Sequence, residues 1–310
     1  MTTTQLRAQF DAHVTFSNGG HLHTEGFRID VPSPSVTEDD VGALFVASLG
    51  LLMVQRIQVE RLSLVAEPHK GTRAGPSDRA TAGVGAQAWR WVELNHVISQ
   101  GMVTYPGLPA PEITPHLTRE ASRQVYAPGT EFAIDRISMV GNTGTYLDSP
   151  FHRYGDGADL AGLPLDKLAD LPTVVARTVG SGTRAVDVGA MAALEVADRA
   201  VLLHTGGDRH WGTPAYTHDA PYLTEAAARW LVEHGARLVG IDAVNIDDAA
   251  GGGDRPAHSV LLAAGVPVVE HLTGLDQVPP HGARFTAAPP RVAGFGTFPV
   301  RAYAAIPSTG

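Results

Sequence analysis

Apolar and polar residues alternate in the first part of the chain in a way that predicts one helix and two or three strands, because the second alternating run is long enough for one strand or two. His21–Val31 and Met53–Glu67 alternate as half-buried strands do, and the segment between them carries apolar residues at helical spacing. Ser35 and Glu38 stand at the spacing of a capping box, which would begin this helix. We therefore predict a small α/β unit over residues 1–70, whose role the sequence does not indicate.

A stretch with almost no large apolar residue follows this unit. Residues 71–88 are rich in Gly, Ala, Ser, Thr and charged side chains, which is typical of a linker. Gly83 and Gly85 have no predicted strand before them, so we do not interpret them as a dinucleotide-binding loop. We expect the main domain to occupy residues 89–310.

Short apolar runs typical of strands recur in this second segment. Two helices are predicted between them, one from Thr224 as N-cap to Gly235 and one that ends at Gly265. The fold class is therefore α/β and rich in strands, with fewer helices than a doubly wound sheet requires. The predicted strands lie within residues 91–99, 132–140, 173–179, 199–205, 237–246, 266–272 and 299–306.

Composition narrows the class of protein and of partner. Apolar residues make up 44% of the chain and charged residues 18%, as in ordinary globular proteins. The formal net charge of −9, with scattered Lys and Arg, argues against a partner such as nucleic acid or a membrane surface. No apolar run is long enough to span a bilayer, and residues 1–16 lack the pattern of a secretory signal. With no cysteine in the chain, we expect a cytoplasmic protein that uses neither disulfides nor thiolate chemistry.

Polar residues gather in residues 141–152, directly after the apolar run Ile134–Val140. Asp148 and His152 are four residues apart, but Pro150 lies between them and cannot sit inside a helix. Glycines interrupt the segment as well. We therefore predict a turn or loop that presents both side chains to a ligand.

Two further candidate residues lie late in the chain. His258 ends the glycine-rich loop 249–258, and Glu270 follows the apolar run Gly265–Val269. Carboxylates and neutral imidazoles can together hold a zinc or manganese ion, or can act as general acid and base without one. Taken singly, such residues more often cap turns or make ordinary hydrogen bonds. The spacing leaves both kinds of site open.

Residues 142–152 (NTGTYLDSPFH) align without gaps to the signature H-x-G-T-H-x-D-x-P-x-H of the cyclase family, which includes bacterial kynurenine formamidase and isatin hydrolase, and they resemble it at all but two of its fixed positions. The resemblance to this family extends from Trp89 to Ile306. It implies a compact β/β/α domain that assembles into a homodimer or a larger homo-oligomer. It also implies an enzyme that acts on a small molecule.

The resemblance further implies roles for single residues. Asp148, His258 and Glu270 match metal-ligand positions of the family, and His152 matches its base. The first two signature histidines are Asn142 and Tyr146 in this chain, and an amide oxygen and a neutral phenol are poor zinc ligands. We therefore expect at most one divalent ion, zinc or manganese, or no metal at all.

Three functions follow from these expectations. The first is hydrolysis of an amide, lactam or ester carbonyl of a small cyclic or aromatic metabolite, with His152 as general base. The second is metal-free cyclisation or dehydration of a polyketide-like intermediate by acid–base catalysis, and the third is small-molecule binding without catalysis. Because the matched carboxylates and histidines are retained together, an enzyme is favoured. The expected catalytic groups are Asn142, Tyr146, Asp148 and His152, and the expected substrate contacts are Tyr105 and Trp211.

Overall fold

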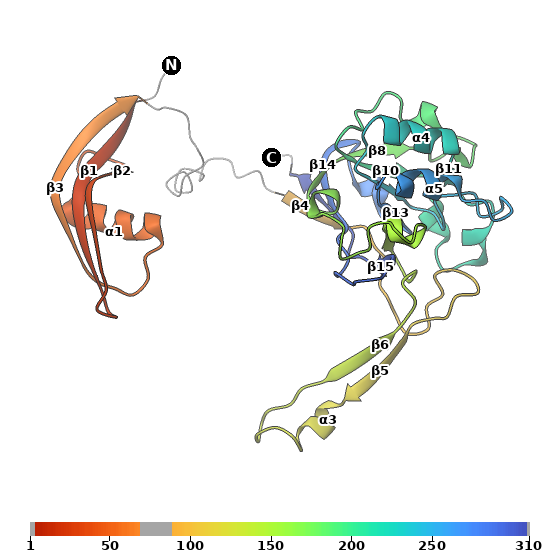
Figure 1. The fold of residues 1–310 in the computed structure, drawn as a ribbon, viewed down its shortest axis with the longest axis horizontal. Helices are drawn as coiled ribbons and strands as arrows, with labels where there is room; N and C mark the ends of the chain where they lie inside the picture. The colour runs from red at the N-terminus through yellow and green to blue at the C-terminus, as the bar shows by residue number, and fades with distance from the viewer. Residues whose placement is uncertain (1–3, 69–88, 309–310) are drawn as a thin grey trace. The chain divides into compact units, whose positions relative to one another are not determined.

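The computed structural model describes residues 4–68 and 89–308. The chain divides into two compact units, Met1–Gln87 and Ala88–Gly310 (Figure 1). The linker predicted for residues 71–88 lies outside the described residues.

The first unit is a three-stranded antiparallel sheet with one helix against it. Strands β1 (Thr4–Phe16), β2 (His21–Asp30) and β3 (Val54–Pro68) lie in the order β2-β1-β3. Helix α1 (Glu38–Leu49) follows β2, and its Phe45 packs on Phe10 and Phe27. The central strand β1 is missing from the predicted elements, because two of its inward-facing residues are alanines and give a weak pattern.

The predicted capping box of α1 is wrong by two residues. The Thr37 side chain accepts a hydrogen bond from the Asp40 backbone N–H, and the Asp40 carboxylate accepts one from the backbone of Thr37. Ser35 instead bonds to Ser33, outside the helix. Two overlapping segments fit the sequence rule, and only the backbone conformation at Thr37 decides between them.

The second unit is built on one nine-stranded sheet with the order β15-β7-β13-β12-β10-β8-β14-β16-β4. The four central strands β13, β12, β10 and β8 are parallel, and the outer strands are antiparallel to their neighbours. The strands are β4 (Trp89–Glu93), β7 (Tyr146–Asp148), β8 (Leu171–Arg177), β10 (Ala200–His204), β12 (Leu238–Ile241), β13 (Val268–Glu270), β14 (His281–Thr286), β15 (Thr297–Pro299) and β16 (Tyr303–Pro307).

Both faces of this sheet are buried. Helices α4 (Glu225–Glu233) and α5 (Pro256–Ala263) lie side by side over one face (Figure 1). Along β10, Val201 and Leu203 pack in the cluster under these helices, while Leu202 packs in a second cluster with residues of β14 and β16. Burial on both sides explains why the sequence shows continuous apolar runs here. The strand-rich α/β class is confirmed.

Smaller elements complete the second unit. A separate pair joins β9 (Ala185–Val186) and β11 (Tyr222–Leu223). Short 3₁₀ turns lie at Pro150–His152, Leu165–Lys167, Val188–Ala190, Gly207–His210, Pro214–Thr217 and Leu275–Gln277. Among the described residues, no helix combines the length and the apolar character needed to cross a membrane.

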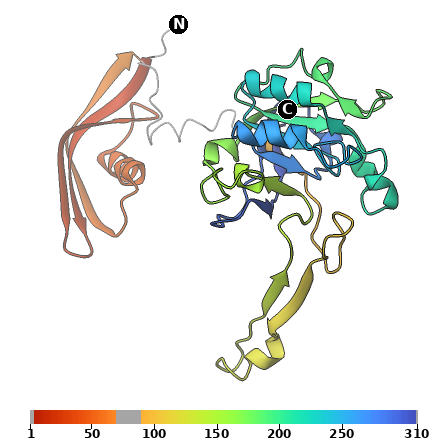
Figure 2. The same cartoon turned by 45° about the vertical axis from the view of Figure 1, so that its right-hand side comes forward.

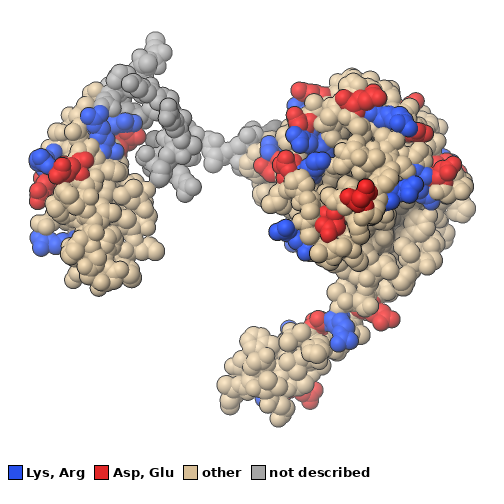
Figure 3. Space-filling model, in the orientation of Figure 1, with Lys and Arg blue, Asp and Glu red and all other residues tan. Residues whose placement is uncertain are grey.

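A long hairpin extends from the second unit. It consists of β5 (Glu112–Leu117), the short helix α3 (Arg119–Ser122) and β6 (Ile134–Ser138), and Figures 1 and 2 both show it reaching away from the nine-stranded sheet. Uncharged atoms cover most of its visible surface, whereas charges of both signs intermingle on the face of the main body (Figure 3). Its exposed apolar side chains are Ile113, Val125, Tyr126, Phe132, Ile134 and Ile137.

The segment 141–152 is more ordered than the predicted loop. Tyr146–Asp148 forms the buried strand β7 between β13 and β15, and Pro150–His152 forms a 3₁₀ turn. The loop prediction is wrong at β7, because a three-residue strand that carries polar side chains gives no recognisable alternation.

Candidate active site

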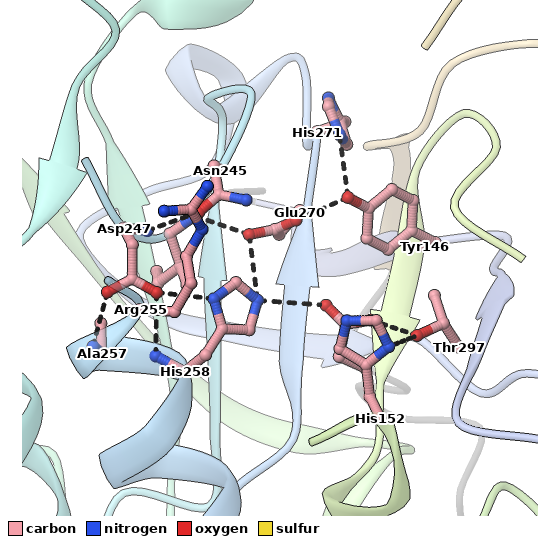
Figure 4. A network of polar contacts seen from close by, with 12 residues as sticks. Tyr146, His152, Asn245, Asp247, Arg255, Ala257, His258, Glu270, His271 and Thr297 are labelled. Carbon is pink, nitrogen blue, oxygen red and sulfur yellow. Dashed lines mark hydrogen bonds and ion pairs between the residues drawn. The ribbon is translucent and has the colours of Figure 1, made fainter. Parts of the chain in front are cut away.

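Residues from four separate elements meet at one edge of the sheet (Figure 4). Asp148 ends β7, His152 ends the 3₁₀ turn after it, and Glu270 ends β13. His258 lies in the first turn of α5. The antiparallel pairing of β7 with β13 brings the residue pairs Asp148–Val268 and Tyr146–Glu270 opposite each other, so the two strands fix the carboxylates in register.

Asp148 is fully buried and has one oxygen without a hydrogen-bond partner. Its Oδ1 accepts a hydrogen bond from Thr297 Oγ1 at 2.5 Å. Its Oδ2 is the unpartnered atom and lies 3.5 Å from His258 Nε2. Burial alone raises the pKa of Asp148, but the close approach of His258 and the positive charge that His152 and His258 can carry outweigh burial, and the net pKa is lowered. Asp148 is therefore a carboxylate with a free oxygen directed at His258.

His258 is oriented by Asp247. Its Nδ1 lies 2.7 Å from Asp247 Oδ2, and the Asp247 carboxylate also accepts hydrogen bonds from the backbone N–H groups of Ala257 and His258. The other ring nitrogen, Nε2, lies 3.4 Å from Glu270 Oε1. Burial lowers the pKa of His258, but the charge of Glu270, the nearby Asp148 carboxylate and the hydrogen bond to Asp247 raise it to about 10. The space around Nε2 therefore attracts positive charge.

Glu270 is also fully buried and uses both of its oxygens. Oε1 accepts a hydrogen bond from the Ile246 backbone N–H at 2.6 Å, and Oε2 accepts one from the Tyr146 hydroxyl at 2.6 Å. Burial and the nearby charge of Asp148 raise the pKa of Glu270 to about 7, although the charge of His258 opposes this. The Tyr146 hydroxyl thus donates its proton to a hydrogen bond with Glu270. Burial, together with the charges of Glu270 and Asp148, raises the pKa of Tyr146 well above its usual value.

The chemistry of this donor set fits a divalent ion. Ligand atoms of Asp148, His258 and Glu270 all lie within 4.8 Å of one another. Because Asp247 accepts the proton of His258 Nδ1, the lone pair of a neutral His258 is on Nε2, facing the two carboxylates. The unpartnered Oδ2 of Asp148 faces the same space. Three protein ligands with a fourth position open to water are a common arrangement at catalytic zinc sites.

His152 is connected to Asp148 through the hydroxyl of Thr297. Thr297 Oγ1 lies 2.5 Å from Asp148 Oδ1 and 2.7 Å from His152 Nδ1. A hydroxyl has one proton, and an ionised carboxylate can only accept, so Thr297 donates to Asp148 and accepts from His152 Nδ1–H. The remaining nitrogen of His152, Nε2, then carries a lone pair. The side chain is 37% exposed, so this nitrogen is accessible to water.

The turn that carries His152 packs closely against Gly296. A Cβ placed on Gly296 would lie 2.7 Å from the backbone N and Cα of His152. The Gly296 carbonyl also accepts a hydrogen bond from the Ser149 backbone N–H. The position of His152 therefore depends on the absence of a side chain at residue 296.

Sequence analysis did not identify His271, which directly follows Glu270. His271 is fully buried, and its φ of 58° is rare for a residue other than glycine. Its Nε2 lies 3.3 Å from the Tyr146 hydroxyl and its Nδ1 lies 2.8 Å from the Tyr216 hydroxyl. Burial, assisted by the charge of His96, lowers the pKa of His271 to about 3, so it is neutral.

Asp247 and Thr297 were not identified either. Thr297 is 149 residues from Asp148, whereas Asp247 is 11 residues from His258, and neither spacing marks a contact between the side chains. The only sequence signal for Asp247 was its place at the end of the strand-like run 237–246.

The predicted substrate contacts Tyr105 and Trp211 lie outside the lining of the pocket. Both pack in an apolar cluster around Tyr216. The Trp211 ring stacks on His96 at 3.8 Å between ring centroids and meets His271 edge to face. Neither residue lines the pocket described next, and their contact with a substrate stays a prediction.

A pocket of about 450 Å³ opens over the cluster. His258 and Glu270 lie in its lining, together with the expected catalytic groups Asn142, Tyr146 and His152. The rest of the lining comprises Arg153, Asn245, Gly253, Asp254 and Arg255. The pocket is large enough for a small metabolite.

Comparisons with known proteins agree with this architecture. The model of the family described as "Putative cyclase" matches residues 92–248. A kynurenine formamidase from Bordetella avium (strain 197N) is 30% identical over 213 residues, which cover 68% of this chain and 95% of the relative.

Two solved structures are also similar. Isatin hydrolase A from Labrenzia aggregata, at 22% identity, superposes with a TM-score of 0.63 over 74% of this chain and 99% of its own. A protein from Bacillus stearothermophilus, described as a predicted metal-dependent hydrolase, is 26% identical with a TM-score of 0.54, over 70% of this chain and 98% of its own.

The chain therefore belongs to the cyclase family. It is a hydrolase of that family. The domain that it shares with its relatives begins near β4.

Proposed function

We propose that the chain hydrolyses an amide, lactam or ester carbonyl of a small cyclic or aromatic metabolite, with one zinc or manganese ion held by Asp148, His258 and Glu270. The observation that carries this proposal is the arrangement around His258, where Asp247 fixes the ring so that Nε2 faces two buried carboxylates. A bound ion would act as a Lewis acid on the scissile carbonyl. The kinship with a kynurenine formamidase supports a C–N bond as the target.

His152 is the proposed general base. Its Nε2 takes a proton from water as the water oxygen attacks the carbonyl carbon, and it later gives this proton to the leaving nitrogen or oxygen as that bond breaks. Thr297 and Asp148 hold the ring, and the Asp148 carboxylate stabilises the imidazolium that forms. Asn142 lines the pocket and is the proposed hydrogen-bond donor to the carbonyl oxygen as negative charge develops there.

Tyr146 is proposed to hold Glu270 in place. Its proton is donated to Glu270 Oε2, and its raised pKa keeps the phenol neutral. In this role the phenol supplies a hydrogen bond that fixes the carboxylate near His258.

A second candidate, metal-free acid–base cyclisation or dehydration, rests on the charge around His258. Because carboxylates raise the pKa of His258 to about 10, a proton on Nε2 can neutralise the cluster in place of a metal ion. Such a pocket would use His152 as base and cationic His258 as acid. Binding without catalysis has no comparable support, because the His152–Thr297–Asp148 connection has no evident use in a binding protein.

Metal content separates the two enzymatic candidates. The full chain would be purified without chelator, incubated with excess zinc or manganese, desalted and measured by mass spectrometry of the metals. One ion per chain, lost in His258→Ala but retained in the control His210→Ala outside the pocket, would support the hydrolase. A folded protein without stoichiometric metal would overturn the metal-assisted proposal and favour the acid–base pocket.

We also propose that the chain acts as a homodimer or larger homo-oligomer. The exposed apolar side chains of the β5–β6 hairpin support this, since such a surface is costly to leave in water. Light scattering should show more than one chain per particle, and Phe132→Ser with Ile137→Thr should lower the molar mass. A monomeric wild-type protein would contradict the proposal.

A further inference from the structure

Two arginines at the pocket have no carboxylate partner. Arg153 directly follows His152, and Arg255 precedes α5 by one residue; both line the pocket. Arg255 donates a hydrogen bond to the Asp254 carbonyl at 2.8 Å, and Arg153 makes a long one of 3.4 Å to the Ser259 hydroxyl. Within residues 4–68 and 89–308, neither guanidinium lies within 4.0 Å of a carboxylate oxygen.

Arg153 and Arg255 are two of several arginines in residues 89–308 that form no ion pair, and these two also line the pocket. The whole chain has more acidic than basic residues, with a formal net charge of −9. Seven other arginines in residues 89–308 form ion pairs, namely Arg123, Arg184, Arg199, Arg229, Arg237, Arg284 and Arg301. The two pocket arginines are therefore positive charges that the protein itself leaves available.

The pocket has carboxylates at its base and positively charged groups at these two arginines. At the base, the carboxylates of Asp148 and Glu270 surround His258, and this region repels an anionic group. Arg255 is half-buried and is drawn next to Asn245 at the edge of the network (Figure 4), so a guanidinium and an amide lie in the same part of the lining. An anion would be attracted to this part, with the reacting carbonyl left to face His152 and the base.

The guanidinium geometry narrows the kind of anion. A guanidinium presents parallel N–H groups that match the two oxygens of a carboxylate. A small aromatic or cyclic compound that carries a carboxylate would fill the pocket. Its carboxylate would bind the arginines, and its reacting carbonyl would face His152.

We propose that the substrate carries a free carboxylate, separate from the scissile carbonyl, which Arg255 binds with the help of Arg153. This inference rests on the proposed function, since it names the substrate class for the same site. Arg255 and Arg153 are then the residues that set specificity for an anionic substrate.

Binding of matched probes tests the proposal without requiring turnover. The probes are the three isomeric formamidobenzoates and the corresponding formamidobenzamides, which differ in the charge of one group. Calorimetry on the full chain gives a dissociation constant for each probe. Hydrogen bonds to a charged group contribute about 1.5–3 kcal/mol, so we expect at least one benzoate to bind roughly tenfold or more tightly than its benzamide.

Substitutions then assign the preference to the arginines. Arg255→Gln should bring the ratio of the two dissociation constants close to one. Arg255→Lys should leave an intermediate ratio, because lysine keeps the positive charge but lacks the paired N–H groups of a guanidinium. Arg153→Gln should reduce the ratio less. Arg136→Gln, which removes the same charge on the hairpin, should leave it unchanged. Circular dichroism would confirm that each variant is folded.

The outcomes separate this inference from the proposed function. Equal binding of benzoates and benzamides, no binding of any benzoate, or an unchanged ratio in Arg255→Gln would overturn the carboxylate assignment. If the wild type selects benzoates but hydrolyses none of the formamides with zinc or manganese, the assignment stands and the hydrolase proposal loses support. If it hydrolyses both series with equal kcat/KM, the hydrolase stands and the assignment is wrong.

Discussion

Asp247 Oδ2 lies 2.7 Å from His258 Nδ1, and the same carboxylate accepts hydrogen bonds from the first backbone N–H groups of α5. One side chain thus fixes both the start of the helix and the orientation of the histidine ring that the helix carries. Because the ring is held from behind, Nε2 is directed between Asp148 and Glu270. The proposed metal site depends on this pair.

Asp247→Asn should weaken metal binding without removing a ligand. An amide can still accept from His258 Nδ1–H, but it lacks the charge that makes the imidazole a better ligand, and loss of such a partner typically lowers affinity by about 10–100-fold. Competition with a zinc-binding dye would measure the change. Asp254→Asn, which alters an exposed carboxylate of the pocket, is the control. An affinity equal to that of the wild type would show that Asp247 has no such role.

Metal affinity should rise with pH. Without metal, the surrounding carboxylates raise the pKa of His258 to about 10, so at neutral pH Nε2 holds a proton that an ion must displace. Displacing this one proton makes the affinity rise by about tenfold per pH unit between the pKa of Glu270, about 7, and that of His258, and more steeply below pH 7, where Glu270 also holds a proton. Titrations at several pH values between mildly acidic and mildly alkaline, corrected for metal hydrolysis, would give the slope. A slope near zero would mean that His258 is neutral before metal binds.

Tyr146→Phe should destabilise the second unit. Removing the hydroxyl leaves Glu270 Oε2 without its donor and takes a partner from His271, both in a fully buried place. An unsatisfied buried group costs about 1–3 kcal/mol of unfolding free energy. All four tryptophans lie in the second unit, so tryptophan fluorescence in denaturant reports on this unit.

The matched control for that change is Tyr154→Phe. The Tyr154 hydroxyl donates to the Ser259 carbonyl in a half-buried place, where water can replace it. We expect the loss in Tyr154→Phe to be the smaller of the two. Equal losses would mean that the Tyr146 hydroxyl is no more important for stability than a surface hydrogen bond.

Thr297→Val should lower kcat more than it raises KM. The substitution keeps the shape of the side chain but removes the hydroxyl that joins Asp148 to His152. Loss of a general base typically costs about 10²–10⁴-fold in rate, and we expect His152→Ala to fall in that range and Thr297→Val to fall short of it. Steady-state kinetics on a hydrolysed formamidobenzoate would provide both constants. Full activity in His152→Ala would exclude it as the base.

The sequence predicted the strands of the parallel core and both of its main helices, because their apolar runs and capping residues are local signals. It also suggested Asp148, His152, His258 and Glu270 as one site, and the structure brings them together at one edge of the sheet. That these residues carry the proposed roles stays a prediction.

The residues that support the site could not be predicted in the same way. His271 follows Glu270 directly, and in a regular strand it would point to the opposite face. Its left-handed backbone conformation instead places its ring against Tyr146 and Tyr216. Thr297 joins Asp148 and His152 only because β15 pairs with β7, and such long-range pairing leaves no mark in either local segment.

Gly296 shows how a residue with no side chain limits what the site can become. Its backbone conformation is available to any residue, so the restriction is one of space alone, set by the turn that carries His152. Random mutagenesis of residue 296 should therefore yield folded proteins that have lost activity, although every polar group of the site is still encoded. The site thus requires a position without a side chain, residue 296, as well as its set of polar side chains.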